Sequence, residues 1–321
     1  MTRAELEEAA LAFADMGLAP PAANSDAAIA EMGWLTMAVP EAAGGLGLGR
    51  EAAGALHVAL GRALVRGATI AQLQVIAALA SADQPDLLAR AMGGEFMTAS
   101  LAGGDDRDVL TAVPDADRAS FVLVRNLAWV SLVPLAGADI RPLSTWDETR
   151  RLFEVRLNDS GMILAEGDSA KALHEALEAH LLFALAGDSL GGAGAVLAMT
   201  VDYLGTRRQF DRPLGMFQAL KHRLADCKTQ IAAAEALFWS RAEGTPTLSQ
   251  TGALKALATT VYRDVAEEAI QLHGGIGLTG EYPCHLFLKR ALLNCALGGD
   301  ADRWEERAGR ELLARMPHPR P

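Results

Sequence analysis

Four arginines fall within 17 residues of the C-terminal half, between the end of one helical pattern and the start of the next. They are Arg207, Arg208, Arg212 and Arg223. Planar guanidinium groups donate paired hydrogen bonds to phosphate and carboxylate oxygens, and the N-terminus of a helix also favours negative charge. The cluster therefore predicts a site for an anionic ligand. A solvated basic turn is the alternative that the spacing leaves open.

A glycine-rich segment, residues 271–283, is the second candidate for chemistry. It begins Gln271-Leu272-His273-Gly274-Gly275 and holds four glycines in all. Glycines let a backbone approach a ligand closely, and unpaired N–H groups there can contact a pyrophosphate. Glycine is also common at the end of any helix, so this signal alone is weak. His273 is more simply interpreted as a packed or capping residue than as a base.

Long helices must position both segments. Leucines recur every four residues from Leu173 to Leu185, which is the apolar stripe of a helix that packs on a neighbour. A second helical pattern opens at the Pro213 boundary, and three more cover about 248–272, 284–297 and 302–315. Long helices joined by short loops usually pack antiparallel as a bundle.

The rest of the chain divides into two further regions. At 321 residues it exceeds the usual single domain of roughly 100–200 residues. We expect residues 1–100 to form an N-terminal helical domain, with helical spacing in 51–65 and 68–82. Residues 101–168 contain short Val- and Leu-rich runs separated by Gly, Asp and Pro, which indicates a small β domain. The bundle occupies 169–321, so the predicted fold is mainly α with a small β domain.

Composition excludes several classes of function. Half of the residues are apolar and 21% are charged, so the chain can bury a core. A formal net charge of −11 argues against a nucleic-acid partner, which needs a basic face. Three cysteines without a CxxC spacing indicate neither a disulfide framework nor a metal site. We find no apolar block typical of a signal peptide and expect a cytoplasmic protein that binds no membrane.

The two candidate segments resemble a known family. RRQFDRPLGMFQALKHRLAD and AIQLHGGIGLTGEYPCHLFLKRA are similar to the two C-terminal signatures of the acyl-CoA dehydrogenases, and EMGWLTMAVPEAAGGLGLG resembles the N-terminal signature. The forms QLHGGIG and HL-L-KRA are similar to the bacterial branch that includes enzymes of steroid side-chain breakdown. In that branch, chains of this kind form heterotetramers of two different dehydrogenase-like subunits.

The resemblance implies a fold, a cofactor and a reaction. The fold is an N-terminal helical domain, a middle β domain and a C-terminal four-helix bundle, assembled as a tetramer that holds FAD across subunit interfaces. The reaction is α,β-desaturation of an acyl-CoA thioester, with an electron-transfer flavoprotein as electron acceptor. The residues that the resemblance assigns to the diphosphate and adenosine part of FAD are Arg207, Phe210, Gln218, Gln271, Gly274 and Gly275.

The catalytic base of the family has no clear counterpart. In most members a glutamate follows the glycine segment, and counting without gaps places that position at Gly298. In a second arrangement the glutamate lies on the first long helix, and counting back from Arg207 gives Leu181, with Leu182 where an arginine is common. The Thr-Glu-Pro segment that holds the flavin ring is replaced by residues 101–106. Trp129-Val130-Ser131 comes too late for the usual Trp-x-Thr and is expected to be a core strand.

Three interpretations follow. In the first, this chain is a subunit that lacks the base and completes the FAD site of a partner, with a steroid side-chain CoA ester as the substrate. In the second, a homo-oligomer uses a displaced carboxylate, either Asp300, which follows Gly298 by two residues, or Glu178, which a register shift of three would bring near. An aspartate at a helix start is more often a cap. In the third, the chain is a flavin-free structural partner, because Asp211 adds negative charge beside the diphosphate site.

Overall fold

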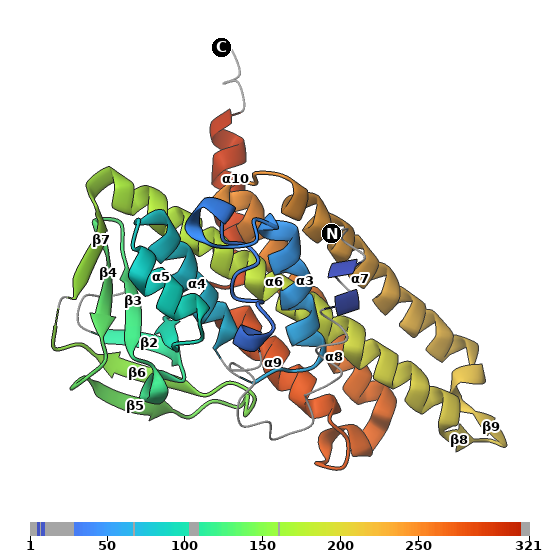
Figure 1. The fold of residues 1–321 in the computed structure, drawn as a ribbon. Coiled ribbons are helices and arrows are strands. Elements are labelled where there is room, and N and C mark those ends of the chain that lie inside the picture. The colour runs from blue at the N-terminus through green and yellow to red at the C-terminus, as the bar shows by residue number, and fades with distance from the viewer. Residues whose placement is uncertain are drawn as a thin grey trace, which may run out of the picture.

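The N-terminal helices pack against the long helix at the centre of the molecule (Figure 1). The structure is a computed structural model that describes residues 5–6, 8–9, 29–66, 68–102, 109–159 and 161–315. The helices of this part are α3 (Gly49–Arg62), α4 (Thr69–Ser81) and α5 (Pro85–Met92). A short 3-10 turn, η1 (Glu41–Ala43), precedes them.

The side chain of Gln72 joins the helical part to the first strand. Its amide nitrogen donates to the carbonyls of Ala91 (3.0 Å) and Glu95 (2.9 Å), and its amide oxygen accepts from the backbone N–H of Met97 (2.7 Å). Gln72 is buried, and its amide is fully used in hydrogen bonds to backbone groups. One side chain therefore fixes α4, the end of α5 and strand β1 (Met97–Ala99) relative to one another.

The β region consists of two small sheets with a shared apolar interior. One sheet has the order β1-β3-β4-β7, in which β1 and β3 are parallel, and the other has the order β2-β6-β5. Alternate side chains such as Val113, Val122 and Phe153 pack together between the sheets. Trp129-Val130-Ser131 lies in β4, and Ser131 is fully buried. The strands are β1 (Met97–Ala99), β2 (Val109–Pro114), β3 (Phe121–Arg125), β4 (Trp129–Pro134), β5 (Asp139–Leu143), β6 (Leu152–Arg156) and β7 (Met162–Glu166).

Five helices form the C-terminal part, with α6 at its centre (Figure 1). The leucine stripe of α6 is fully or almost fully buried at Leu177, Leu181 and Leu185. By length and composition α6 could cross a membrane, but 83% of its most apolar window is buried inside the protein. The expectation of a mainly helical fold with a small β region is confirmed. The helices are α6 (Gly167–Thr206), α7 (Gln218–Glu243), α8 (Leu248–His273), α9 (Cys284–Ala296) and α10 (Ala301–Arg315).

The second helix of this part begins later than the sequence pattern indicated. Pro213 belongs to a short strand, residues 214–216 form a 3-10 turn, and α7 starts at Gln218. The chain reverses direction here in a tight hairpin, which the apolar spacing of Leu214 and Phe217 conceals. Gln218 is therefore the first residue of a helix.

A buried network of charged and polar side chains ties the β region to the bundle. Arg290 of α9 donates from Nε to Asp147 (2.8 Å), and Arg150 pairs with Asp188 of α6 (2.9 Å). Asn294 donates to the second oxygen of Asp188 (2.7 Å). Burial alone would raise the pKa of Asp188, but Arg150 and Arg290 outweigh it and hold that pKa below its usual value. The network fixes the face of α6 against α9.

Candidate functional site

The arginine-rich segment forms an exposed hairpin at one end of the bundle (Figure 1). Strands β8 (Arg208–Gln209) and β9 (Arg212–Pro213) pair antiparallel. Phe210 and Asp211 form the turn with φ angles of +51° and +62°, a region that bulky residues rarely adopt. The Phe210 side chain is 84% exposed. A strained, exposed aromatic residue is unfavourable for an isolated chain and is typical of a surface that contacts a ligand or a partner.

Arg207 presents a guanidinium group that the protein leaves available. Its backbone N–H donates to Tyr203 (2.8 Å) and its carbonyl accepts from Leu214 (2.8 Å), so the main chain is fixed. Within the described residues, we find no ion pair that engages its exposed side chain. Arg208, in contrast, donates to the carbonyl of Asp211 (2.6 Å), and Arg212 lies 4.0 Å from the centre of the Phe217 ring. Arg207 is therefore the arginine of this hairpin best placed to bind an anion.

Gln218 lies beside this hairpin at the N-terminus of α7. Its side chain is exposed, and it is the first residue of a 26-residue helix. The unpaired N–H groups of a helix start carry partial positive charge, which attracts phosphate oxygens. The hairpin and the helix start together offer a cation, an aromatic ring and backbone donors on one surface.

The glycine-rich segment ends α8 in an open turn. Gly274 has a φ of +67°, and a Cβ atom added there or at Gly275 would have no neighbour within 4 Å. Gln271 is exposed one turn earlier. Open backbone at two consecutive glycines leaves room for a ligand to approach the main chain. The residues present fit the diphosphate of a dinucleotide.

His273 is a packed residue, which agrees with the simpler interpretation. It is 4% exposed, its Nδ1–H donates to the carbonyl of Ala269 (2.7 Å), and Cys284 Sγ lies 3.8 Å from the same nitrogen. Its ring stacks on Tyr203 with centroids 4.5 Å apart. His273 therefore supports the segment rather than facing a ligand.

Tyr203 brings the two segments to the same end of the bundle. Its hydroxyl donates to the carbonyl of His273 (3.3 Å), and its own carbonyl accepts from the backbone N–H of Arg207. The predicted cofactor residues thus gather around the end of α6 and the end of α8. All six of them are exposed.

The two positions at which the resemblance places a base lie against each other. A Cβ atom at Gly298 would be 3.1 Å from Leu182 Cδ2, 3.2 Å from Leu185 Cδ1 and 3.7 Å from Leu181 Cδ2. All three leucines are fully buried. An ionised carboxylate among such side chains would lose its hydration without compensation. This region is apolar and closely packed.

The loop that carries Gly298 is held from three directions. The Gly298 N–H donates to the carbonyl of Leu101 (2.9 Å), and the Gly298 carbonyl accepts from Trp304 Nε1 (2.8 Å). The ammonium of Lys255 donates to the carbonyls of Cys295 (2.9 Å) and Gly299 (2.6 Å). Burial lowers the pKa of Lys255 to about 8. The sequence did not single out Lys255, because its partners lie 40 and 44 residues away in the chain, nor did it single out Trp304. Of residues 101–106, the structure describes only Leu101 and Ala102.

The two displaced carboxylates have different surroundings. Asp300 is exposed, and its Oδ1 accepts from the backbone N–H of Arg303 (3.0 Å) at the start of α10, as a cap does. Glu178 is 4% exposed and lies one turn before Leu181 and Leu182. One oxygen of Glu178 is 3.4 Å from Arg303 Nη2, and the other is 3.8 Å from His174 Nε2. Burial, followed by the charge of Arg125, lowers the pKa of His174 to about 4, so Arg303 is the cation that balances Glu178.

Comparisons with known proteins agree with these features. Residues 2–86 match the model of the N-terminal domain of acyl-CoA dehydrogenases, and residues 180–313 match the model of the C-terminal domain. The chain is similar to the acyl-CoA dehydrogenase IpdE2 of Mycobacterium tuberculosis, with 34% identity over 81% of this chain and 77% of that protein.

Solved structures share the fold over nearly the whole chain. The Tcur3481-Tcur3483 steroid ACAD, solved as a single-residue variant, has a TM-score of 0.85 and 26% identity, and the match covers 97% of this chain and 98% of that one. A chain of the ChsE4-ChsE5 complex from Mycobacterium tuberculosis has a TM-score of 0.85 and 24% identity, covering 98% of both. This second likeness concerns the fold alone.

Proposed function

Because the chain belongs to the acyl-CoA dehydrogenase family, we propose that it is one subunit of a heteromeric, FAD-dependent enzyme that desaturates an acyl-CoA thioester between the α and β carbons. The chain supplies part of the FAD site and leaves proton abstraction to the other subunit. The observation that carries the proposal is the packing of Gly298 against Leu181, Leu182 and Leu185.

The reaction requires a base that this region does not provide. A carboxylate must reach the α-proton within hydrogen-bond distance, about 2.6–3.2 Å. Neither family position for that carboxylate can accept a proton, because residue 298 is a glycine without a side chain and residue 181 is a leucine. Bound FAD would supply the hydride acceptor for the β carbon. The missing group is therefore the base, and a second subunit is its source.

The predicted FAD residues have separate tasks. Arg207 would bind the diphosphate through charge-assisted hydrogen bonds, Phe210 would pack on the adenosine part, and Gln218 would bind polar atoms beside the start of α7. The glycine segment, with Gln271, Gly274 and Gly275, would approach the same end of a neighbour's FAD through its backbone. All six residues are exposed in the single chain, so a second protein surface would be needed to enclose the cofactor.

The names of relatives support a heteromer and a steroid-type substrate. One similar structure, at 26% identity, is the Tcur3481-Tcur3483 steroid ACAD. We propose that this chain likewise pairs with a second dehydrogenase-like subunit in the cytoplasm, that its substrate is a steroid side-chain CoA ester, and that an electron-transfer flavoprotein accepts the electrons.

Glu178 supports a second candidate function, a homo-oligomer with a displaced base. Its carboxylate is buried one helical turn from Leu181 and Leu182. The salt bridge with Arg303 argues against it, because one oxygen of that carboxylate already contacts a guanidinium group. Asp300 is a weaker candidate since it caps α10. A flavin-free structural role is the third possibility, which Asp211 favours and the surrounding arginines oppose.

Cofactor stoichiometry separates these functions. The chain is expressed alone and together with a dehydrogenase-like neighbour that carries a clear glutamate, and FAD released by denaturation is counted per chain. The proposal predicts one FAD for every two chains in the complex and no turnover by the chain alone. A homotetramer of this chain with one FAD per subunit and full turnover would refute it. A complex without FAD would instead support the structural role.

A further inference from the structure

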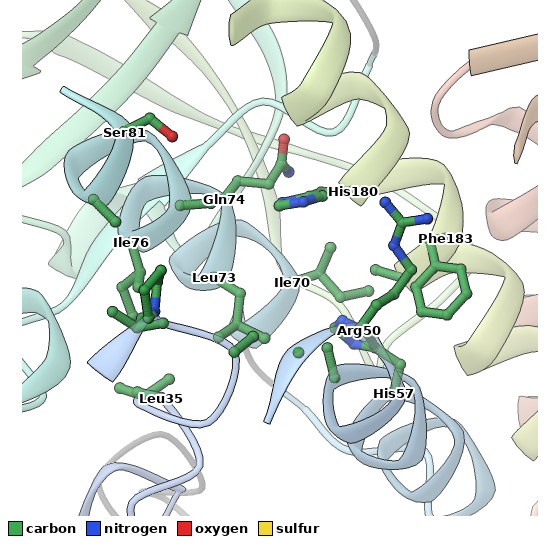
Figure 2. Close-up of a pocket in the computed structure, with 18 residues that line it drawn as sticks. Leu35, Arg50, His57, Ile70, Leu73, Gln74, Ile76, Ser81, His180 and Phe183 are labelled. Atoms are coloured by element: carbon green, nitrogen blue, oxygen red, sulfur yellow. The ribbon is translucent and has the colours of Figure 1, made fainter. Parts of the chain in front are cut away.

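A cavity lies between the N-terminal helices and α6, away from the FAD segments. Its walls come from α3, α4, one side of α6 and the loop at residues 35–40, and its volume is about 400 Å³. That volume lies within the usual range for small-molecule pockets, about 300–1,000 Å³. Figure 2 shows Arg50, Gln74 and His180 on one side of the hollow and Leu35, Leu73 and Ile76 on the other. The cavity is therefore amphipathic.

The cavity uses a different side of α6 from the Gly298 contact. His180, Phe183 and Ala184 line it, whereas Leu181, Leu182 and Leu185 face Gly298. Residues at these positions point in different directions around a helix with 3.6 residues per turn. The cavity is thus a separate feature, and what it binds does not depend on where the catalytic base lies.

Two buried side chains in its wall lack hydrogen-bond partners. Gln74 is 2% exposed, and neither its amide oxygen nor its amide nitrogen has a partner within the described structure. His57 is 4% exposed, and its Nδ1 is likewise unpaired there. A buried polar group without a partner costs about 1–3 kcal/mol. Such groups in a cavity wall indicate a ligand that supplies the missing partners.

Arg50 gives the cavity its charge. Its Nη1 donates to the carbonyl of Arg241 (3.3 Å), and its guanidinium lies 5.7 Å from the centre of the Phe183 ring. Among the described residues, no carboxylate forms an ion pair with it. Burial lowers the pKa of His57 to about 4, so its imidazole is neutral at pH 7. A cation without a counter-ion in a partly dehydrated site favours an anionic ligand.

We propose that this cavity binds an apolar carboxylic acid. Arg50 binds the carboxylate, the amide of Gln74 binds a second polar atom, and the aliphatic chains of Ile70, Leu73 and Ile76 cover the hydrocarbon. The space equals the liquid volume of roughly 13 water molecules, which suits a medium-length chain or a small ring system. The carboxylate belongs either to a free acid or to the far end of an acyl group in CoA linkage. Only the second source rests on the proposed function.

Isothermal titration of the full chain, or of its complex, with octanoate tests the free-acid source. The expected result is saturable binding that weakens at least about tenfold in Arg50→Met, since one charge-assisted pair is lost. Gln74→Leu removes the buried amide that has no hydrogen-bond partner and should also weaken octanoate binding. The melting temperature of this variant reports whether the fold persists. Arg62→Met, at the exposed end of the same helix, is the matched control and should bind octanoate as the wild type does.

A second titration uses the CoA monothioester of decanedioic acid. If the CoA thioester binds in a way that depends on Arg50 while octanoate does not bind, the carboxylate is assigned to the far end of an acyl group in CoA linkage. If Arg50→Met and the wild type bind both probes equally, or if neither probe binds to the folded wild type, the proposal is wrong. A crystal grown with octanoate that shows only ordered water beside Arg50 and Gln74 would also overturn it. None of these outcomes depends on turnover. Failure of the cavity proposal can therefore be told apart from failure of the proposed function.

Discussion

Gly298 and Leu182 are so close that a Cβ atom at residue 298 would lie 3.1 Å from Leu182 Cδ2. Residue 298 also has a φ of +67°, a conformation that favours glycine. Residues 182 and 298, which are 116 residues apart in the sequence, therefore lie next to each other in the structure. The chain combines a glycine at one of the family's base positions with leucine at and beside the other.

Gly298→Ala should destabilise the protein through both packing and backbone strain. Left-handed backbone costs a non-glycine residue about 1–2 kcal/mol, and overpacking adds about 1–3 kcal/mol. Urea unfolding measures the sum. Gly137→Ala is the matched control, because Gly137 has a φ of +81° and open space around its Cβ position. Adding Leu182→Ala to Gly298→Ala should recover part of the free energy of unfolding that is lost through overpacking. Equal decreases in the free energy of unfolding for Gly298→Ala and Gly137→Ala would contradict the account.

Arg207→Ala should reduce FAD retention by the assembled enzyme without unfolding the chain. The Arg207 side chain is exposed and its main chain is held by backbone hydrogen bonds. A hydrogen bond to a charged group is worth about 1.5–3 kcal/mol, or roughly 10- to 100-fold in affinity. Fluorescence of FAD released on dilution gives the dissociation constant. Arg310→Ala, an exposed arginine of α10 paired with Glu306, is the control. Unchanged FAD affinity in Arg207→Ala would remove this residue from the cofactor site.

Arg290→Met should destabilise the chain strongly. It removes the cation that pairs with the buried Asp147, whereas Asp188 keeps its pair with Arg150. Breaking a buried pair in this way costs about 3–5 kcal/mol. The neighbouring Lys289→Met removes only the pair with the exposed Glu148 (3.1 Å), which is worth about 0–1 kcal/mol. Chemical denaturation measures the free energy of unfolding of both variants. A similar loss in the two variants would show that the network does not hold the β region to the bundle.

Stability should fall between pH 7 and pH 5 because of His57. Its pKa in the folded state is about 4, chiefly through burial, and lies below the usual 6.5. As the pH falls below 6.5, the unfolded chain takes up a proton that the folded chain does not, so the free energy of unfolding decreases until the pH passes the folded value. This imidazole alone contributes about 2 kcal/mol of that decrease between pH 7 and pH 5.

His57→Leu should flatten this pH dependence, measured as urea midpoints across the same range. His222→Leu, at an exposed position of α7, controls for the loss of a histidine. An unchanged slope in His57→Leu would mean that the buried imidazole is not the source.

The sequence predicted the bundle well because its signals are local. The four-residue leucine spacing, the paired glycines after His273 and the capping role of Asp300 each reflect neighbours in the chain. The start of α7 was misplaced, since the turn at residues 214–216 carries the same apolar residues as a helix. Local patterns also indicated no partner for Lys255, whose contacts lie at Cys295 and Gly299.

The least predictable features were contacts between distant segments. Nothing in the sequence indicated that Gly298 meets Leu182, that Glu178 pairs with Arg303, or that Gln74 is buried without a partner. Each depends on how α6 packs against its neighbours. Motif spacing suggested which groups could bind a cofactor, while only the packing shows why a carboxylate does not fit beside the leucines.

The most direct test of the central claim is the rate at which acyl-CoA reduces the flavin of the assembled enzyme in a single turnover. The variant carries Glu178→Gln and Asp300→Asn in this chain, and the partner is unchanged. We predict a rate within about twofold of the wild type, because the base comes from the other subunit. A fall of roughly 10²- to 10⁴-fold, the usual contribution of general-base catalysis, would place the base in this chain and contradict the account.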